Sequence, residues 1–186
     1  VHEGRPRIDA LLSLTGFSLV GGPAYNDAHA AQTVLSQLDV PYLSAHPLEF
    51  QSIDQWAQDM RGLLPVESTI MVAIPELDGA TVPMVFAGRA GAANTQCGGC
   101  ERGCRFGAQS LSHDMFACPE RIDLLSDRVA HWVRLRRKSH AQRKLAIVLF
   151  NFPPQAGHVG TAAFLAVFES LHNTLQAMAQ QGYDVE

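Results

Sequence analysis

Residues 145–161 read Leu-Ala-Ile-Val-Leu-Phe-Asn-Phe-Pro-Pro-Gln-Ala-Gly-His-Val-Gly-Thr, and this stretch decides the fold that the sequence predicts. Its first six residues are apolar without alternation, which is typical of a short strand that helices bury on both faces. Pro153 and Pro154 stop helix and strand alike, and Thr161 stands where a helix can begin. In α/β proteins such a helix N-terminus binds ligands, because unpaired N–H groups converge there. A tight connection without a ligand fits the same spacing.

The rest of the chain repeats this alternation of apolar runs and amphipathic segments. We predict strands within 7–20, 40–45, 69–74 and 145–150, and helices after Asn26 or Asp27, over 53–60, from Pro119 and up to Gly182. Strands that alternate with helices form a parallel sheet with right-handed crossovers, so the fold class is α/β with Rossmann-like or flavodoxin-like units.

The expected organisation is an α/β unit over 1–90, a cysteine-rich insert over 91–118, and a helix-strand-helix over 119–186 that continues into a further α/β unit. The chain starts at Val1, and its last four residues resemble the beginning of another strand. We therefore expect a piece of a larger multidomain protein.

Composition excludes several classes of function. Of the 186 residues, 47% are hydrophobic and 17% are charged, and the net charge is −4, which argues against nucleic-acid binding. No apolar run approaches the roughly 20 residues of a transmembrane helix. The exception to the acidic character is a basic run at Arg134, Arg136, Arg137, Lys138, His140, Arg143 and Lys144. It either complements the dipole of the preceding helix or docks a partner.

Several ordered blocks carry a family resemblance. They are 16–24 (Gly-Phe-Ser-Leu-Val-Gly-Gly-Pro-Ala), 38–42 (Leu-Asp-Val-Pro-Tyr), 75–79 (Pro-Glu-Leu-Asp-Gly), 85–89 (Val-Phe-Ala-Gly-Arg) and 152–163 (Phe-Pro-Pro-Gln-Ala-Gly-His-Val-Gly-Thr-Ala-Ala). Together they resemble the large, porphyrin-binding subunit of magnesium chelatase and its cobaltochelatase relatives. The sequence Leu-His-Asn-Thr-Leu at 171–175 is similar to the bacteriochlorophyll branch.

The resemblance implies an activity and its partners. Such subunits bind protoporphyrin IX and insert Mg²⁺, while an AAA+ ATPase subunit and an adaptor subunit supply ATP-driven remodelling. This chain has no Walker lysine motif, which agrees with ATP hydrolysis in a partner. The implied location is the cytoplasm, peripheral to photosynthetic membranes at most. A cobaltochelatase large subunit acting on a corrin precursor is the alternative within the family, and a flavodoxin-like nucleotide binder ranks last.

Glu76 and Asp78 are the catalytic candidates. They lie between Pro75 and Gly79, where the sequence predicts the exit of a buried strand. Insertion of Mg²⁺ into a porphyrin requires the removal of two pyrrole protons and partial dehydration of the cation, and a carboxylate can assist in either step. The alternative is an Asx turn at Asp78 with Glu76 in solvent.

Four cysteines lie within one short segment. Cys97, Cys100, Cys104 and Cys118 are all the cysteines of the chain. Four thiolates in a reducing compartment suit an iron–sulfur cluster or Zn²⁺ rather than disulfides. Free thiols, disulfides and a redox-sensing module are the alternatives. Because many relatives lack such an insert, we do not expect the core chemistry to need it.

The remaining candidates would contact the substrate. A guanidinium at Arg89 suits a porphyrin propionate, or else bridges to Glu76 or Asp78. His46 follows a predicted strand and could assist porphyrin or metal. The turn residues Gly157, Gly160 and Thr161 would line the helix mouth. His158 departs from the family pattern, so a catalytic role for it is doubtful.

Overall fold

The computed structural model describes residues 6–22, 25–109, 111, 114–149 and 166–185. The chain divides into two compact units, Val1–Val133 and Arg134–Glu186, which are described separately below. The first unit contains every strand of the described residues. None of the described helices has both the length and the apolar composition needed to cross a bilayer.

A four-stranded sheet forms the centre of the first unit. Its strands are β1 (Leu11–Ser13), β4 (Tyr42–Ser52), β5 (Thr81–Arg89) and β6 (Met115–Ala117), in the spatial order β1-β4-β5-β6. β1, β4 and β5 are parallel, and β6 pairs antiparallel to β5. Two further short strands, β2 (Gly21–Gly22) and β3 (Tyr25–Asn26), form a separate antiparallel pair. The predicted α/β class with a mostly parallel sheet is confirmed.

Helices lie between the parallel strands, and one long helix follows β6. They are α1 (Ala28–Leu38), α2 (Ile53–Gln58), α3 (Pro65–Glu67), the π-helix η1 (Ser68–Ala73), α4 (Ile74–Leu77) and α5 (Pro119–Arg137). Asp27 caps α1 by accepting a hydrogen bond from the amide of Ala30 at 2.8 Å, as predicted. Ser52 and Gln55 form a capping box on α2. The second unit holds a 3₁₀ turn η2 (His140–Gln142) and α6 (Val167–Gln180).

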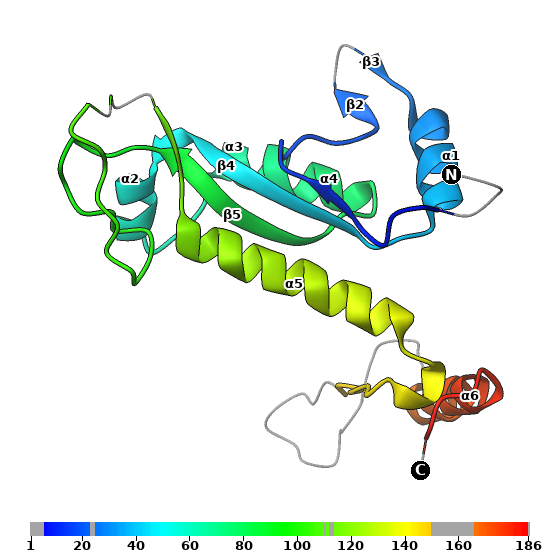
Figure 1. The fold of residues 1–186 in the computed structure, drawn as a ribbon. Helices are drawn as coiled ribbons and strands as arrows, with labels where there is room; N and C mark the ends of the chain where they lie inside the picture. Colours follow the sequence, from blue (N-terminus) through cyan, green and yellow to red (C-terminus); the bar gives the residue numbers. More distant parts are fainter. Residues whose placement is uncertain (1–5, 23–24, 110, 112–113, 150–165, 186) are drawn as a thin grey trace. The chain divides into compact units, whose positions relative to one another are not determined.

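The core of the first unit lies on both faces of the sheet. Ala45 and Met84 pack against Leu125 of α5. The neighbouring Val85 and Leu48 pack with Ile53 of α2, because successive side chains of a strand point to opposite faces. Figure 1 shows α5 on one side of β4 and β5, with α3 and α4 on the other.

One predicted strand is wrong. Residues 69–74 belong to η1 and the start of α4, not to a strand. Buried side chains recur here every four residues, at Glu67, Met71 and Pro75, whereas a strand buried on both faces would bury successive ones. The β-branched run misled the prediction because the burial pattern, rather than propensity, decides the local structure.

Other predictions hold only in part. The strand predicted over 40–45 runs on to Ser52, and Pro47 is accommodated by a register shift between His46 and Pro47. The strand predicted within 7–20 is confined to Leu11–Ser13. Residues 145–149 carry no strand and are exposed, and Phe150 lies outside the described residues. The predicted helices after Asp27, within 53–60, from Pro119 and up to Gly182 are confirmed.

Candidate functional site

Glu76 and Asp78 sit at the end of a helical segment rather than at the exit of a strand. Glu76 is exposed in the short helix α4, and Asp78 caps that helix. The Oδ2 atom of Asp78 accepts a hydrogen bond from the amide of Leu19 at 3.0 Å. This bond fastens the loop after β1 to the acidic turn, so two of the family blocks meet here.

Asp78 also acts on a buried neighbour. Burial raises the pKa of Tyr42, and the charge of Asp78 raises it further. Gly79 ends the acidic turn with a φ of +91°, and the amide of Ala80 donates to the carbonyl of Pro75 at 3.0 Å. The turn is therefore locally fixed, although the strand that was expected to position it is absent.

His46 lies inside β4, not after a strand, and it is 1% exposed. Neither ring nitrogen has a hydrogen-bond partner among the described residues. Burial lowers the pKa of His46, while the neighbouring Glu67 opposes that shift. Because the ring is fully covered in this structure, contact between His46 and a substrate would require the first unit to open.

Glu67 is a buried carboxylate that the sequence analysis did not identify. It is 0% exposed and accepts hydrogen bonds from the side-chain amide of Gln51, from the amide of Leu64 at 3.1 Å and from the amide of Phe50 at 3.3 Å. Three donors compensate for its burial. Its place two residues after Pro65, at the start of a helical segment, was the available signal.

Arg89 is the last residue of β5. Its partner in the parallel register is Ser52 of β4, so Arg89 lies at the edge where the strands end. Within the described part of the chain, the ion pairs join Arg61 to Asp59 and Arg102 to Asp123, so Arg89 does not bridge to Glu76 or Asp78. The alternative role as an internal bridge is therefore wrong for this structure.

The cysteine segment folds against the sheet. Cys97 and Phe106 belong to the same core cluster as Leu48, and Phe106 makes an edge-to-face contact with Phe116 at 5.1 Å between ring centroids. The amide of Cys97 donates to the carbonyl of Cys104 at 2.6 Å. The thiol loop is therefore anchored by buried residues at its base.

All four cysteines are free thiols, and they influence one another. Burial opposes ionisation of Cys100, but hydrogen bonds with Cys118, with the amide of Arg102 and with Cys104 lower its pKa overall. Burial raises the pKa of Cys97, Cys104 and Cys118, and the nearby Cys100 contributes to each increase. The thiols are neighbours, yet no three His, Cys, Asp or Glu side chains of the described residues are arranged to hold a metal ion. The cluster is not a preformed tetrahedral site.

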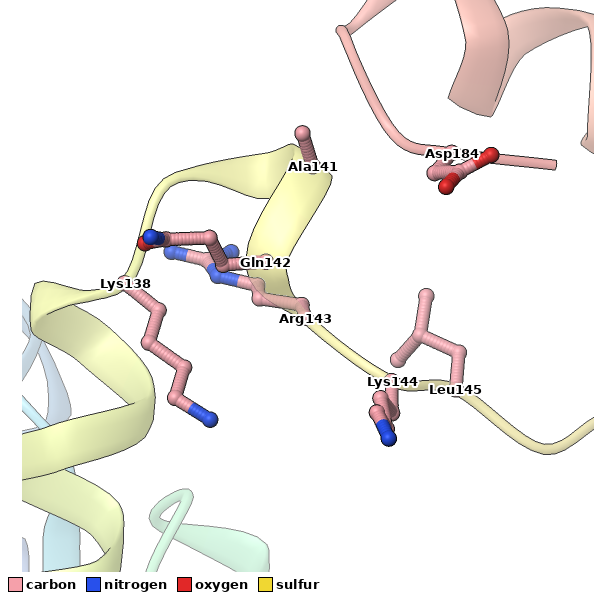
Figure 2. Close-up of a pocket in the computed structure, with 7 residues that line it drawn as sticks. All are labelled: Lys138, Ala141, Gln142, Arg143, Lys144, Leu145 and Asp184. Atoms are coloured by element: carbon pink, nitrogen blue, oxygen red, sulfur yellow. The ribbon is translucent and has the colours of Figure 1, made fainter.

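The basic run forms a pocket in the second unit. The pocket of about 620 Å³ is lined by Lys138, Ala141, Gln142, Arg143, Lys144, Leu145 and Asp184 (Figure 2). Arg143 is held by a hydrogen bond to the hydroxyl of Tyr183 at 3.1 Å, and His140 stacks on the same ring at 4.6 Å between centroids. The pocket lining thus contains three cationic side chains and one carboxylate, which agrees with either interpretation of the basic run.

Comparison with known proteins identifies the family. The family model described as CobN/Magnesium Chelatase matches residues 1–186. The chain belongs to the CobN/magnesium chelatase family. It is 57% identical over 180 residues to the magnesium-chelatase H subunit of Cereibacter sphaeroides, covering 96% of this chain and 15% of that protein. It is 53% identical over 191 residues to the magnesium-chelatase H subunit of Rhodobacter capsulatus, covering 98% of this chain and 16% of that protein.

More distant relatives of this chain include subunits named as cobaltochelatases. Aerobic cobaltochelatase subunit CobN of Pseudomonas aeruginosa is 32% identical, over 100% of this chain and 14% of that protein. Among solved structures, the catalytic subunit of cobaltochelatase from Mycobacterium tuberculosis matches with a TM-score of 0.64 and 25% identity, over 95% of this chain and 14% of that chain. The resemblance inferred from the sequence blocks is confirmed, and the chain spans about one-seventh of the length of these family members.

Part of the predicted site lies outside the described residues. Gly157, Gly160, Thr161 and His158 all fall within the undescribed residues 150–165. Within the described residues the acidic turn precedes Thr81, the first residue of β5, whereas Arg89 is the last residue of that strand. At about 3.3 Å per residue the two lie roughly 25 Å apart, so the structure does not bring Arg89 together with Glu76 and Asp78.

Proposed function

We propose that this chain is part of the large subunit of a magnesium chelatase of the bacteriochlorophyll branch. That subunit binds protoporphyrin IX and inserts Mg²⁺, while an AAA+ ATPase subunit and an adaptor subunit consume ATP. The observation that supports this choice is the identity of 57% and 53% to subunits named for magnesium, against 32% to a subunit named for cobalt. A cobaltochelatase large subunit that acts on a corrin precursor is the second candidate, because the family model covers both branches.

The acidic turn is the proposed catalytic element. Insertion forms four bonds between Mg²⁺ and pyrrole nitrogens and releases the protons of two N–H groups. The exposed carboxylate of Glu76 can accept one of these protons, or hold Mg²⁺ through oxygen while waters leave. Asp78 supports it by fixing the turn through its bond to Leu19. Glu76 is exposed, as a carboxylate that reaches the substrate must be, and the alternative of a carboxylate that only faces solvent shares this exposure.

Arg89, which lies at the opposite end of β5 from the acidic turn, and the glycine-rich turn are proposed to hold the substrate. A guanidinium binds a propionate with two parallel hydrogen bonds, and Arg89 has no ion-pair partner among the described residues. Gly157, Gly160 and Thr161 would supply backbone donors at a helix mouth. For His46, burial restricts the proposed role to a contact made after a conformational change.

The four cysteines are proposed to hold an iron–sulfur cluster or Zn²⁺ when the full subunit is assembled. The support for this proposal is chemical: four thiols lie within one short segment, and Cys104 and Cys118 influence the pKa of Cys100. The present arrangement does not fit a bound ion, so the thiols would have to move, and we route no step of the reaction through this site. Redox sensing by the free thiols is the competing role.

The location proposed for the protein is the cytoplasm, at the surface of photosynthetic membranes. It follows from the proposed product, which is a precursor of membrane-bound pigment.

A direct assay tests the proposed function. Full-length subunit, partner subunits and ATP are incubated with protoporphyrin IX and Mg²⁺, and in parallel with a corrin precursor and Co²⁺. Formation of magnesium protoporphyrin with no cobalt corrin supports the proposal. Exclusive formation of the cobalt corrin would refute the proposal and support the second candidate, a cobaltochelatase large subunit.

A further inference from the structure

An apolar groove runs along α5 in the first unit. The α5 groove, as it is called below, has a volume of about 520 Å³ and is lined by Leu12, Leu14, Phe86, Ile122, Val129 and Val133, with further apolar or small residues of α5 between them. Its only polar side chain is Ser126. Leu14 is 48% exposed and Ile122 is 39% exposed, so the groove is open to solvent.

The arrangement of the described helices explains why this face is left open. Figure 1 shows α3 and α4 on the side of β4 and β5 that is opposite to α5. On the other face, α5 packs on Met84 and Ala45 through Leu125. Parallel sheets are normally covered on both faces. Among the described residues of the first unit, no helix other than α5 covers the half of this face next to β1.

We propose that the α5 groove is the docking surface for an amphipathic helix from another part of the same large subunit. The stripe Ile122, Ser126, Val129 and Val133 advances by four, three and four residues, which keeps it straight along α5. The small side chains of Ser126 and Ala130 let a second helix approach to the 8–10 Å spacing of packed helices. One helix beside α5 would complete the second layer over β1.

The chemistry of the groove fixes the character of that helix. With no charged group in the lining, a charge on the docking stripe would be buried without a partner. The occupant therefore carries Leu, Ile, Val or Phe at positions i, i+3 or i+4, and i+7, and a polar opposite face. A porphyrin fits less well, because its propionates would find no cation in the lining.

The length of the relatives supplies a source for such a helix. This chain spans 15% and 16% of the two similar magnesium-chelatase subunits, so most of a full-length subunit lies outside it. The inference rests on one part of the proposed function, namely that the chain is part of such a subunit. A second copy of the chain and the tetrapyrrole are the other occupants that an experiment must separate.

Site-directed cross-linking in the full-length subunit tests the proposal. Ser126→Cys, alkylated with a short photoactivatable group, is irradiated, and the joined peptides are mapped by mass spectrometry. We expect an intramolecular product with a helical segment outside these 186 residues, and at least a tenfold loss of yield when Val129→Glu is added. Leu124→Glu is the matched control, because Leu124 is exposed on the same helix but does not line the groove. It should leave the yield unchanged.

Other results would overturn the proposal. A product between two copies, recognised by mixing isotopically labelled subunits, would make the groove an interface between subunits. Loss of the product on addition of protoporphyrin IX would make it a ligand site, and the absence of any product would leave it as an open surface. Porphyrin binding and Mg²⁺ insertion by the unmodified subunit are measured in parallel. Their failure would refute the proposed function, whereas their success without the expected product refutes the docking proposal alone.

Discussion

Gly16 is the position at which the structure makes its sharpest energetic prediction. It has a φ of +69°, and a Cβ atom added there would lie 2.6 Å from Cβ of His46 and 3.3 Å from Cγ of Met71. A non-glycine residue in the left-handed region costs about 1–2 kcal/mol, and forcing a methyl group into a packed site costs about 1–3 kcal/mol more. Gly16→Ala should therefore destabilise the first unit by about 2–5 kcal/mol.

Gly62 provides the matched control. Its φ is +78°, yet a Cβ atom there would meet nothing within 4 Å. Gly62→Ala should therefore cost only the backbone strain, about 1–2 kcal/mol. The difference between the two variants isolates the close approach of Gly16 to His46.

Urea unfolding of the 186-residue chain measures both effects. Trp56 and Trp132 both lie in the first unit, so their fluorescence reports on that unit. With an m-value of about 2 kcal/mol/M, Gly16→Ala should lower the midpoint by about 1–2.5 M. Equal midpoints for Gly16→Ala and Gly62→Ala would refute the packing of the loop after β1 on His46.

Three further predictions concern the core and the thiols. The pKa of buried His46 is lowered, so His46 binds a proton at a higher pH in the unfolded chain than in the folded chain, and stability should fall as the pH drops below about 6.5. His46→Gln should flatten this dependence in urea midpoints measured between pH 7.5 and 5.5. An unchanged slope would contradict the burial of the ring. Leu125→Ala should lower the free energy of unfolding by about 2–5 kcal/mol in the same assay, because Leu125 is 4% exposed and packs against Ala45 and Met84. A loss below about 1 kcal/mol would show that α5 does not pack there. Cys97→Ser with Cys100→Ser should remove bound iron or zinc from the full-length subunit, measured by elemental analysis, while chelation survives; loss of chelation in a folded variant would instead give the insert a direct role.

The sequence predicted the fold class because its strongest signals are local. Asp27, Pro119 and Gly182 mark helix ends through caps and backbone preferences that act within a few residues. The sequence analysis missed the strand β5, because Pro83 and Gly88 interrupt its apolar run. Its backbone is nevertheless held by pairing with β4 and β6, which are distant in the sequence.

The site was predicted less well than the fold. Glu76 and Asp78 were placed after a strand because Thr69 and its neighbours are β-branched, but burial at four-residue steps makes that segment helical. Glu67 was missed because its role depends on Gln51, 16 residues away, and on burial that no local pattern shows. The proximity of the cysteines was foreseeable because they share one short segment.

The account depends most on the acidic turn, and one measurement tests it directly. Glu76→Gln in the full-length subunit should keep porphyrin binding, followed by fluorescence quenching, and lose Mg²⁺ insertion in the presence of the partner subunits and ATP. Glu49→Gln is the control, because Glu49 is an exposed carboxylate of β4 outside the proposed site. Undiminished insertion by Glu76→Gln, with the control equally active, would contradict the assignment of the turn as the catalytic element.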